Sequence, residues 1–289
     1  MTPGTFEYHR PASVAEAVEL LARDGETAQV LAGGHSLVPM MKLRLAQPEH
    51  LVDINAIDEL KGIERINGEI RIGATTTQAE AVASDELSGA CPIIAETLAV
   101  VADPQVRNCG TIGGNCANGD PGNDLPAVMI ALDAFFTLAG ASGSRRVAAR
   151  AFYRGTFDTA LEPGEILTEI RIAPPPAGHG YSYRKLKRKV GDYATAAAAV
   201  ILEVDGGGCT AAAVALTNLG PAAIEARQAA EALIGTSVDD AAVNEAASRA
   251  MDATDPAGDM HGPPEYRTRM AGEMTRRAIR IALARATGG

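Results

Sequence analysis

Cysteine is scarce in this chain of 289 residues. The four cysteines are Cys91, Cys109, Cys116 and Cys209, and no two of them have the C-x-x-C spacing. A disulfide framework or an iron–sulfur cluster requires a better-organised set. We therefore expect buried or loop thiols, no metal ligands in this chain, and any metal chemistry on another polypeptide.

Hydrolytic and acid–base motifs are absent. The chain has five histidines and contains no G-x-S-x-G elbow, no H-E-x-x-H pair and no P-loop. It therefore offers few groups for proton transfer. Such a composition is typical of a protein whose chemistry belongs to a bound cofactor, and no side chain is expected to be catalytic.

Long apolar runs and excess positive charge are also missing. No apolar stretch approaches the ~18 residues of a membrane span, and residues 1–7 lack the form of a signal peptide. The net charge of −10 and a pI near 5.0 argue against binding to nucleic acid or to an anionic membrane. These absences predict a soluble, cytoplasmic protein.

Glycine, by contrast, occurs in two informative motifs, Ala32-Gly33-Gly34-His35-Ser36 and Thr111-Ile112-Gly113-Gly114-Asn115. Paired glycines adopt positive φ at little steric cost and let backbone N–H groups approach an anion. Two such loops in one folding unit predict a shared, extended, phosphate-bearing ligand such as a dinucleotide. The first motif lacks the G-x-G-x-x-G spacing of a Rossmann site, and taken alone it is also compatible with an ordinary turn.

Asp124 follows the second motif at the start of a predicted helix that has Pro126 in its first turn. An aspartate in this position favours a helix N-cap. A contact to the hydroxyl or amino groups of a nucleotide is the functional alternative, and one carboxylate can serve both roles.

Helix and strand signals alternate in the first part of the chain. Ser13 and Glu16 form a capping-box pattern before an amphipathic run, and residues 27–31 and 50–55 indicate short strands. A second unit begins near residue 60. Its expected elements are a strand over 68–73, a helix capped by Thr77, a mostly buried helix over 91–101 and a strand-rich segment over 135–172.

The proline-rich stretch 174–178 is the best linker candidate. Beyond it, residues 181–187, 195–204 and 209–216 indicate three strands, of which the last two form a hairpin through the turn 205–208. The alanine-rich remainder, 221–286, is expected to be mostly helical. Its arginines have helix-like spacings and are expected on the surface; they are Arg267, Arg269, Arg276, Arg277 and Arg280.

Segments 32–45, 51–55, 106–115 and 124–127 together resemble the FAD-binding medium subunits of the molybdenum hydroxylases, the family that contains xanthine dehydrogenase and aerobic carbon monoxide dehydrogenase. The resemblance covers the whole chain and is strongest to the carbon monoxide dehydrogenase branch. It implies an α+β fold: a two-subdomain, PCMH-type FAD-binding domain over residues 1–177 (subdomains about 1–58 and 59–177), then a C-terminal domain over 178–289 with a three-stranded antiparallel sheet and a helical bundle.

The resemblance also implies a noncovalent FAD site. Both glycine motifs would bind the pyrophosphate and adjoining groups, Asp124 the ribose or ribitol region, and Leu167 would pack near the flavin ring. Lys185 matches a lysine near the cofactor, with Lys187 as the alternative, and Tyr193 would lie beside the isoalloxazine. The implied cofactor-binding residues are Ala32, Gly33, Gly34, His35, Ser36, Thr111, Gly113, Gly114, Asn115, Asp124, Leu167, Lys185 and Tyr193.

Function follows from the same resemblance. The flavoprotein would accept electrons from the [2Fe–2S] clusters of a small subunit, while a large subunit carries the molybdenum cofactor. The implied assembly is a dimer of heterotrimers that contacts the inner face of the membrane only through the complex. Other interpretations are the medium subunit of an aromatic, N-heterocycle or xanthine-type hydroxylase, a stand-alone flavin oxidase of the vanillyl-alcohol type, or a scaffold subunit. Related flavoenzymes attach FAD through histidine, which makes His35 the candidate for a covalent alternative.

Overall fold

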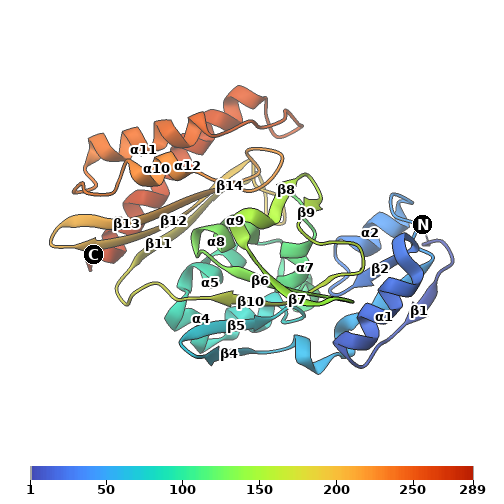
Figure 1. Cartoon of the computed structure of the whole chain (residues 1–289). Coiled ribbons are helices and arrows are strands. Elements are labelled where there is room, and N and C mark those ends of the chain that lie inside the picture. The colour runs from blue at the N-terminus through green and yellow to red at the C-terminus, as the bar shows by residue number, and fades with distance from the viewer. Residues whose placement is uncertain (1, 289) are drawn as a thin grey trace.

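The computed structural model describes residues 2–288. The chain begins with a small α/β unit at one end of the molecule (Figure 1). Its three strands form a parallel sheet in the order β1-β3-β2, as the sequence predicts for a partly parallel unit. Its elements are β1 (Glu7–His9), α1 (Val14–Asp24), β2 (Ala28–Leu31), α2 (Leu37–Lys42) and β3 (His50–Asp53).

The predicted cap of α1 is present in a modified form. The hydroxyl of Ser13 accepts the N–H of Glu16 at 3.2 Å, but the Glu16 carboxylate accepts the N–H of Ala12 at 2.8 Å, not that of Ser13. The helix buries Ala17, Val18 and Leu21 against the sheet.

The second unit contains a five-stranded antiparallel sheet in the order β4-β5-β10-β6-β7. One face buries Ile70, Ile72 and Phe136 under helices, while the other carries an ion pair in which Arg71 Nε lies 2.6 Å from Glu169. Alternate residues of a strand point to opposite faces, which explains the division. The strands are β4 (Ile63–Ile66), β5 (Glu69–Gly73), β6 (Phe135–Gly140), β7 (Gly143–Ala148) and β10 (Ile166–Ile172).

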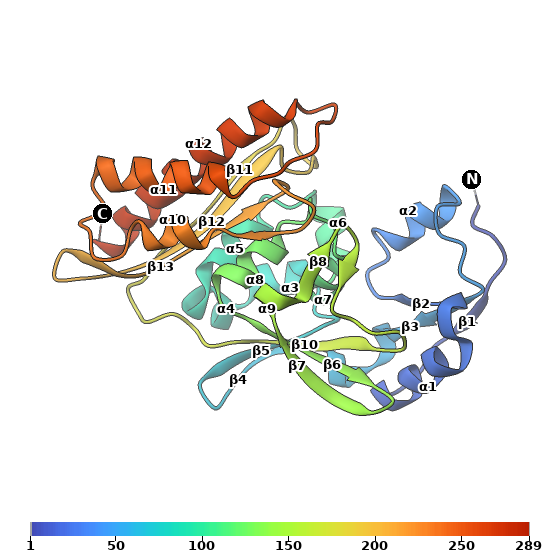
Figure 2. The ribbon, with the colours of Figure 1, turned by 45° about the horizontal axis from the view of Figure 1, so that its top comes forward.

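Short helices cover the apolar face of this sheet (Figure 2). Thr77 and Glu80 close a complete capping box at the start of α3, as predicted. The segment after β7 adds a helical turn and a two-stranded ribbon, β8 (Tyr153–Gly155) with β9 (Asp158–Thr159). The helices are α3 (Gln78–Ala83), α4 (Asp85–Ala90), α5 (Pro92–Leu98), α6 (Pro104–Cys109), α7 (Ile112–Ala117), α8 (Leu125–Ala131) and α9 (Ala149–Phe152).

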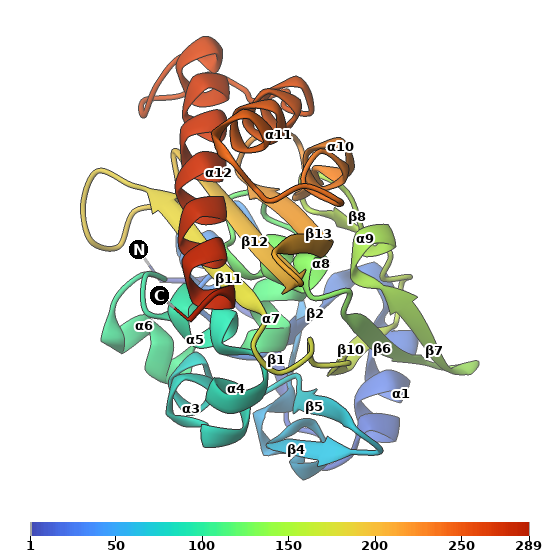
Figure 3. The same cartoon turned by 90° about the vertical axis from the view of Figure 1, so that its left-hand side faces the viewer.

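The C-terminal region is an antiparallel sheet with three helices on one face (Figure 3). The three predicted strands are present, and a two-residue strand, β14, extends the sheet beside β13. Alanines on β12 let α12 approach closely, and the other face of the sheet packs on α5 and α8. The elements are β11 (Gly180–Leu186), β12 (Ala196–Asp205), β13 (Gly208–Thr217), β14 (Ile224–Glu225), α10 (Arg227–Glu231), α11 (Asp240–Asp252) and α12 (Pro264–Ala286).

One of the arginines expected on the surface is buried. Arg267, in the first turn of α12, donates to the carbonyls of Thr195, Ala257 and Asn218 and pairs with Asp259. A buried guanidinium is stable only when its donors are satisfied, and here loops distant in sequence supply the acceptors. Helical spacing alone therefore gave the wrong prediction for this residue.

The cysteines are unpaired within the described residues, as expected. Cys91, Cys116 and Cys209 are buried and Cys109 is exposed. Burial raises the pKa of the Cys116 thiol to about 12, which makes it unreactive. Among residues 2–288, no helix combines the length and the apolar character that crossing a bilayer requires.

Candidate functional site

The two glycine motifs, far apart in sequence, lie against each other in the structure. Residues 32–36, here called the first loop, leave the carboxyl end of β2. Residues 111–115, the second loop, begin α7. A Cβ atom on Gly33 would clash with the carbonyl oxygen of Cys109 and lie 2.7 Å from Cα of Gly110. Only glycine permits this approach, which joins the first loop to the segment that precedes the second.

The second loop uses its backbone donors in its own fold. The N–H groups of Ile112 and Gly113 donate to the carbonyls of Thr76 and Ala74, each at 2.9 Å. The hydroxyl of Thr111 accepts the N–H of Gly114 at 3.0 Å and caps α7. A Cβ on Gly113 would lie 2.6 Å from the Ala74 carbonyl oxygen, so the loop is fixed against the segment between β5 and α3.

The first loop keeps its donors free. Within residues 2–288, the N–H groups of Gly34, His35 and Ser36 donate to no protein acceptor. Gly34 has a φ of 72°, and Ser36 precedes α2 without a side-chain capping bond. The loop therefore presents backbone N–H groups and one hydroxyl to a ligand.

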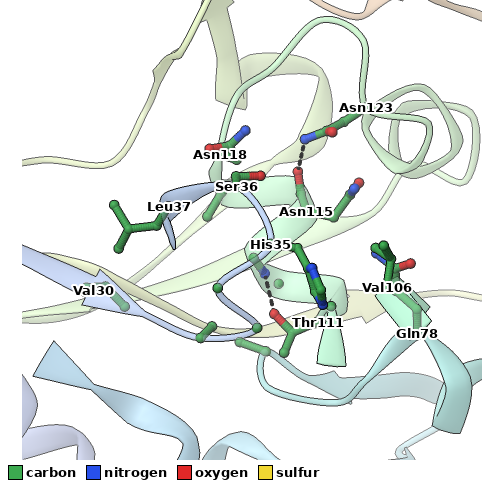
Figure 4. Close-up of a pocket in the computed structure, with 18 of the residues that line it drawn as sticks. Val30, His35, Ser36, Leu37, Gln78, Val106, Thr111, Asn115, Asn118 and Asn123 are labelled. Carbon is green, nitrogen blue, oxygen red and sulfur yellow. Dashed lines mark hydrogen bonds between the residues drawn. The ribbon is translucent and has the colours of Figure 1, made fainter. Parts of the chain in front are cut away.

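A cavity of about 640 Å³ lies between these loops and the C-terminal sheet. This volume is within the range of small-molecule and cofactor sites. Figure 4 shows His35 and Ser36 of the first loop near Thr111 and Asn115 of the second. The cavity is lined by every residue that the sequence assigns to the cofactor, namely Ala32, Gly33, Gly34, His35, Ser36, Thr111, Gly113, Gly114, Asn115, Asp124, Leu167, Lys185 and Tyr193.

Two buried polar atoms in the cavity wall lack partners. They are Oδ1 of Asn115 and Oε1 of Gln78, for which residues 2–288 supply no hydrogen-bond partner. Leaving a buried acceptor unpaired costs about 1–3 kcal/mol, so these atoms favour a ligand that brings hydrogen-bond donors. The Asn115 backbone carbonyl, in contrast, accepts the side-chain amide of Asn123 at 2.8 Å (Figure 4).

Asp124 lies at the start of α8, but its side chain does not cap the helix. Its carboxylate accepts the hydroxyl of Tyr183 at 2.6 Å and the ammonium of Lys185 at 2.7 Å. Asp124 therefore occupies the predicted N-cap position without making the capping hydrogen bond, because two residues of β11 engage its carboxylate. Burial raises the pKa of Asp124, and Lys185 and Tyr183 oppose that rise.

Between the two candidate lysines, the structure places Lys185 in the cavity wall. The side chains of Lys185 and Asp124 are 3% and 4% exposed, whereas the ammonium of Lys187 donates to the carbonyl of Val100 at 3.0 Å and is not part of the wall. Alternation along β11 sends Tyr183 and Lys185 to the same face. Residues 184–189 include five basic side chains, a composition typical of a solvated strand and turn, but the Lys185 side chain of this run is buried.

Leu167 and Tyr193 form the remaining predicted parts of the wall. Leu167 is a buried residue of β10. Tyr193 follows β11, is half-exposed, and packs its ring within 3.3 Å of the position a Cβ would take on Gly122. The cavity thus has an apolar side and an aromatic ring beside its opening.

Sequence reasoning missed several polar residues of the wall, chiefly Gln78, Asn118 and Asn123. The segment 118–123, directly after the second loop, is rich in Asn, Gly, Asp and Pro, which indicates a functional turn. Gln78 gave no such signal, because it reaches the cavity only through the packing of α3 beside α6.

Two known protein families match this chain, one over its N-terminal part and one over its C-terminal part. Residues 4–175 match the family described as FAD binding domain in molybdopterin dehydrogenase. Residues 181–282 match the CO dehydrogenase flavoprotein C-terminal domain.

Relatives match over nearly their entire length. The carbon monoxide dehydrogenase medium chain of Afipia carboxidovorans is 56% identical over 99% of both chains. A chain of the Cu,Mo-CO dehydrogenase crystal structure superimposes with a TM-score of 0.98, at 55% identity over 99% of this chain and 100% of that one. A chain of quinoline 2-oxidoreductase from Pseudomonas putida 86 gives a TM-score of 0.93, at 36% identity over 100% of this chain and 99% of that one. The chain therefore belongs to the FAD-binding medium subunits of the molybdenum hydroxylase family.

Proposed function

We propose that this chain is the FAD-carrying medium subunit of an aerobic carbon monoxide dehydrogenase. Identity of 56% to a carbon monoxide dehydrogenase medium chain, against 36% to a quinoline-oxidising relative, favours this branch. When bound, FAD takes up electrons from the iron–sulfur clusters of a partner and delivers them to an external acceptor such as a quinone. The observation that carries the proposal is a cavity with free loop donors in a chain of this family.

The residues present fit FAD. The free N–H groups of the first loop and the Ser36 hydroxyl are donors suited to the pyrophosphate. The unpaired oxygens of Asn115 and Gln78 suit the hydroxyl and amino groups of a dinucleotide. We assign noncovalent binding, as the resemblance to the family implies, and His35 in the cavity wall is the residue at which the covalent alternative would form.

The opposite wall would orient the isoalloxazine. Leu167 offers an apolar surface, and Tyr193 would cover the cavity opening and limit the access of water. The buried pair of Asp124 and Lys185 would hold the C-terminal sheet against the cofactor domain. We assign Asp124 a contact to the ribose or ribitol region and Lys185 a position near the cofactor.

Assembly and domain division are part of the same proposal. The chain would bind a small [2Fe–2S] subunit and a large molybdopterin subunit in a dimer of heterotrimers, in the cytoplasm, touching the membrane only through the complex. We place the domain boundary at 177/178, which lies between the two family matches, and the subdomain boundary near 58/59. The match over 99% of a medium chain supports this interpretation over a stand-alone oxidase or a scaffold.

The second candidate function is the medium subunit of an aromatic or N-heterocycle hydroxylase, because the quinoline-oxidising relative has the same fold. Co-expression of the chain with its two partner subunits, followed by an assay of dye reduction, distinguishes the two candidate functions. We expect a complex with equal amounts of the three subunits that reduces the dye with carbon monoxide. Activity with quinoline or xanthine alone would favour the second candidate, and failure to form a complex would contradict both.

A further inference from the structure

A cluster of ligand-type side chains lies outside the cavity, at the edge of the N-terminal sheet. Parallel pairing of β1 with β3 sets Glu7 opposite His50 and His9 opposite Val52. Because alternate residues share a face, Glu7, His9 and His50 point to the same side of the sheet. His9 and His50 are 41 residues apart, so only strand pairing brings them together.

The donor atoms of these side chains converge on one point. Nε2 of His9 lies 3.2 Å from Nδ1 of His50, and the Glu7 carboxylate lies 3.9 Å and 3.6 Å from these two atoms. The imidazole rings are stacked, with centroids 5.4 Å apart. Both histidine side chains are about one-fifth exposed, so an ion can reach the point from solvent.

Asp24, the last residue of α1, adds a second carboxylate. Its Oδ2 lies 4.0 Å from His9 Nε2 and 3.7 Å from His50 Nδ1, and its side chain is 8% exposed. Both oxygens of Asp24 accept hydrogen bonds from the Arg23 guanidinium at 2.7 Å, so the carboxylate has to turn from Arg23 to bind an ion.

We propose that Glu7, His9 and His50 form a binding site for one divalent metal ion of the Zn²⁺ type, with the neighbouring Asp24 carboxylate as the fourth ligand. In a tetrahedral zinc site with metal–ligand distances of about 2.0–2.2 Å, neighbouring ligand atoms lie about 3.3–3.6 Å apart. The separations of 3.2–3.9 Å among Glu7, His9 and His50 need only small side-chain adjustments to reach this geometry. Asp24 Oδ2, at 3.7–4.0 Å from the two histidine nitrogens, has to turn further toward the ion. Each imidazole would bind the ion through the ring nitrogen that faces the other histidine, and would carry its N–H on the other ring nitrogen.

Such an ion links three elements of the N-terminal unit. β1 is a three-residue strand at the edge of the sheet (Figure 2), and the site joins it to β3 and to the end of α1. Binding to the folded state alone stabilises the chain by mass action. This site revises the expectation, based on local spacing, that the chain has no metal ligands.

The test uses the untagged full chain, freed of metal with a chelator and dialysed against Zn²⁺, with bound metal counted by mass spectrometry. We expect one Zn²⁺ per chain, a rise in the melting temperature, and a tetrahedral visible absorption band when Co²⁺ replaces Zn²⁺. His9→Gln and His50→Gln should each weaken binding at least about tenfold.

His179→Gln is the matched control, because His179 is an isolated histidine outside the cluster; it should bind like the original chain. If a histidine variant fails to fold, Glu7→Gln still tests the site, because the Glu7 side chain is 72% exposed and its replacement should not disturb the fold. No stoichiometric binding, or binding that all the cluster variants leave unchanged, would overturn the proposal.

Discussion

The second glycine loop uses its backbone donors within its own fold, whereas the first loop keeps them free. Thr111 caps the second loop and Gly113 is held against Ala74. Gly34 and Ser36 of the first loop have no such partners among residues 2–288. Two motifs that share a Gly-Gly pair therefore have different roles. The second loop is a rigid frame. The first loop packs through Gly33 against Cys109 and Gly110, just before that frame, and carries the donors for the ligand.

Two ion pairs show the same contrast. On the side of the second loop, Lys185 and Asp124 are almost wholly buried. On the side of the first loop, Arg145 and Glu165 are 37% and 10% exposed. The strength of an ion pair depends on its burial, so substitutions on the two sides should have unequal effects.

The largest effect is expected from Asp124→Asn. The variant leaves the Lys185 ammonium buried without a counter-charge, which should lower the free energy of unfolding by about 3 kcal/mol. Urea denaturation measures this. Asp58→Asn, which removes the partner of Lys61 in an exposed pair, is the control and should change stability by less than about 1 kcal/mol. Equal losses of unfolding free energy in the two variants would contradict the expected difference between the buried and the exposed ion pair.

Gly113→Ala tests the rigidity of the frame. The new methyl group would meet the backbone of Ala74 and should lower the free energy of unfolding by about 2 kcal/mol while reducing the bound FAD. Thermal unfolding and the flavin-to-protein ratio report the two effects. Gly89→Ala is the control. Its new methyl group, on helix α4, would have no neighbouring atom within 4 Å, so the free energy of unfolding should stay equal or rise by up to about 1 kcal/mol.

Gly33→Ala should affect the cofactor more than the fold. Its methyl group would push the first loop away from Cys109, and FAD affinity should fall at least tenfold, about 1.4 kcal/mol. Titration of the apoprotein with FAD gives the affinity. The contrast between the loops would be wrong if Gly33→Ala destabilised the chain more than Gly113→Ala does.

The smallest effect concerns pH. The hydrogen bond from Arg145 lowers the pKa of Glu165 below its ordinary value of 4.5. The ionised Glu165 carboxylate therefore contributes fully to the stability of the folded chain above about pH 4.5. This contribution is lost as the pH falls through the folded-state pKa of Glu165. Glu165→Gln should cost about 0.5–1 kcal/mol at pH 7 and flatten the acid side of the stability profile. Urea midpoints across the pH range check this, and an unchanged acid slope would contradict it.

Local patterns predicted the elements well because their causes lie within a few residues. The caps at Ser13 and Thr77 and the hairpin at 205–208 are examples. Contacts between distant segments were not predictable in this way. Asp124 meets Lys185 from β11, and Arg267 meets carbonyls from several loops. The glycine motifs indicated the cavity because paired glycines are typical of a close backbone approach. Gln78 also lines the cavity, but no local sequence pattern indicates this.

The central claim is that the two loops together hold FAD without a covalent bond. The visible spectrum of the purified full chain, before and after acid precipitation, tests it most directly. We predict flavin absorption bands in the native chain and all of the flavin in the supernatant after precipitation. Flavin retained in the pellet would indicate a covalent bond at a residue such as His35. A chain that stays colourless even when purified with its partner subunits would contradict the account.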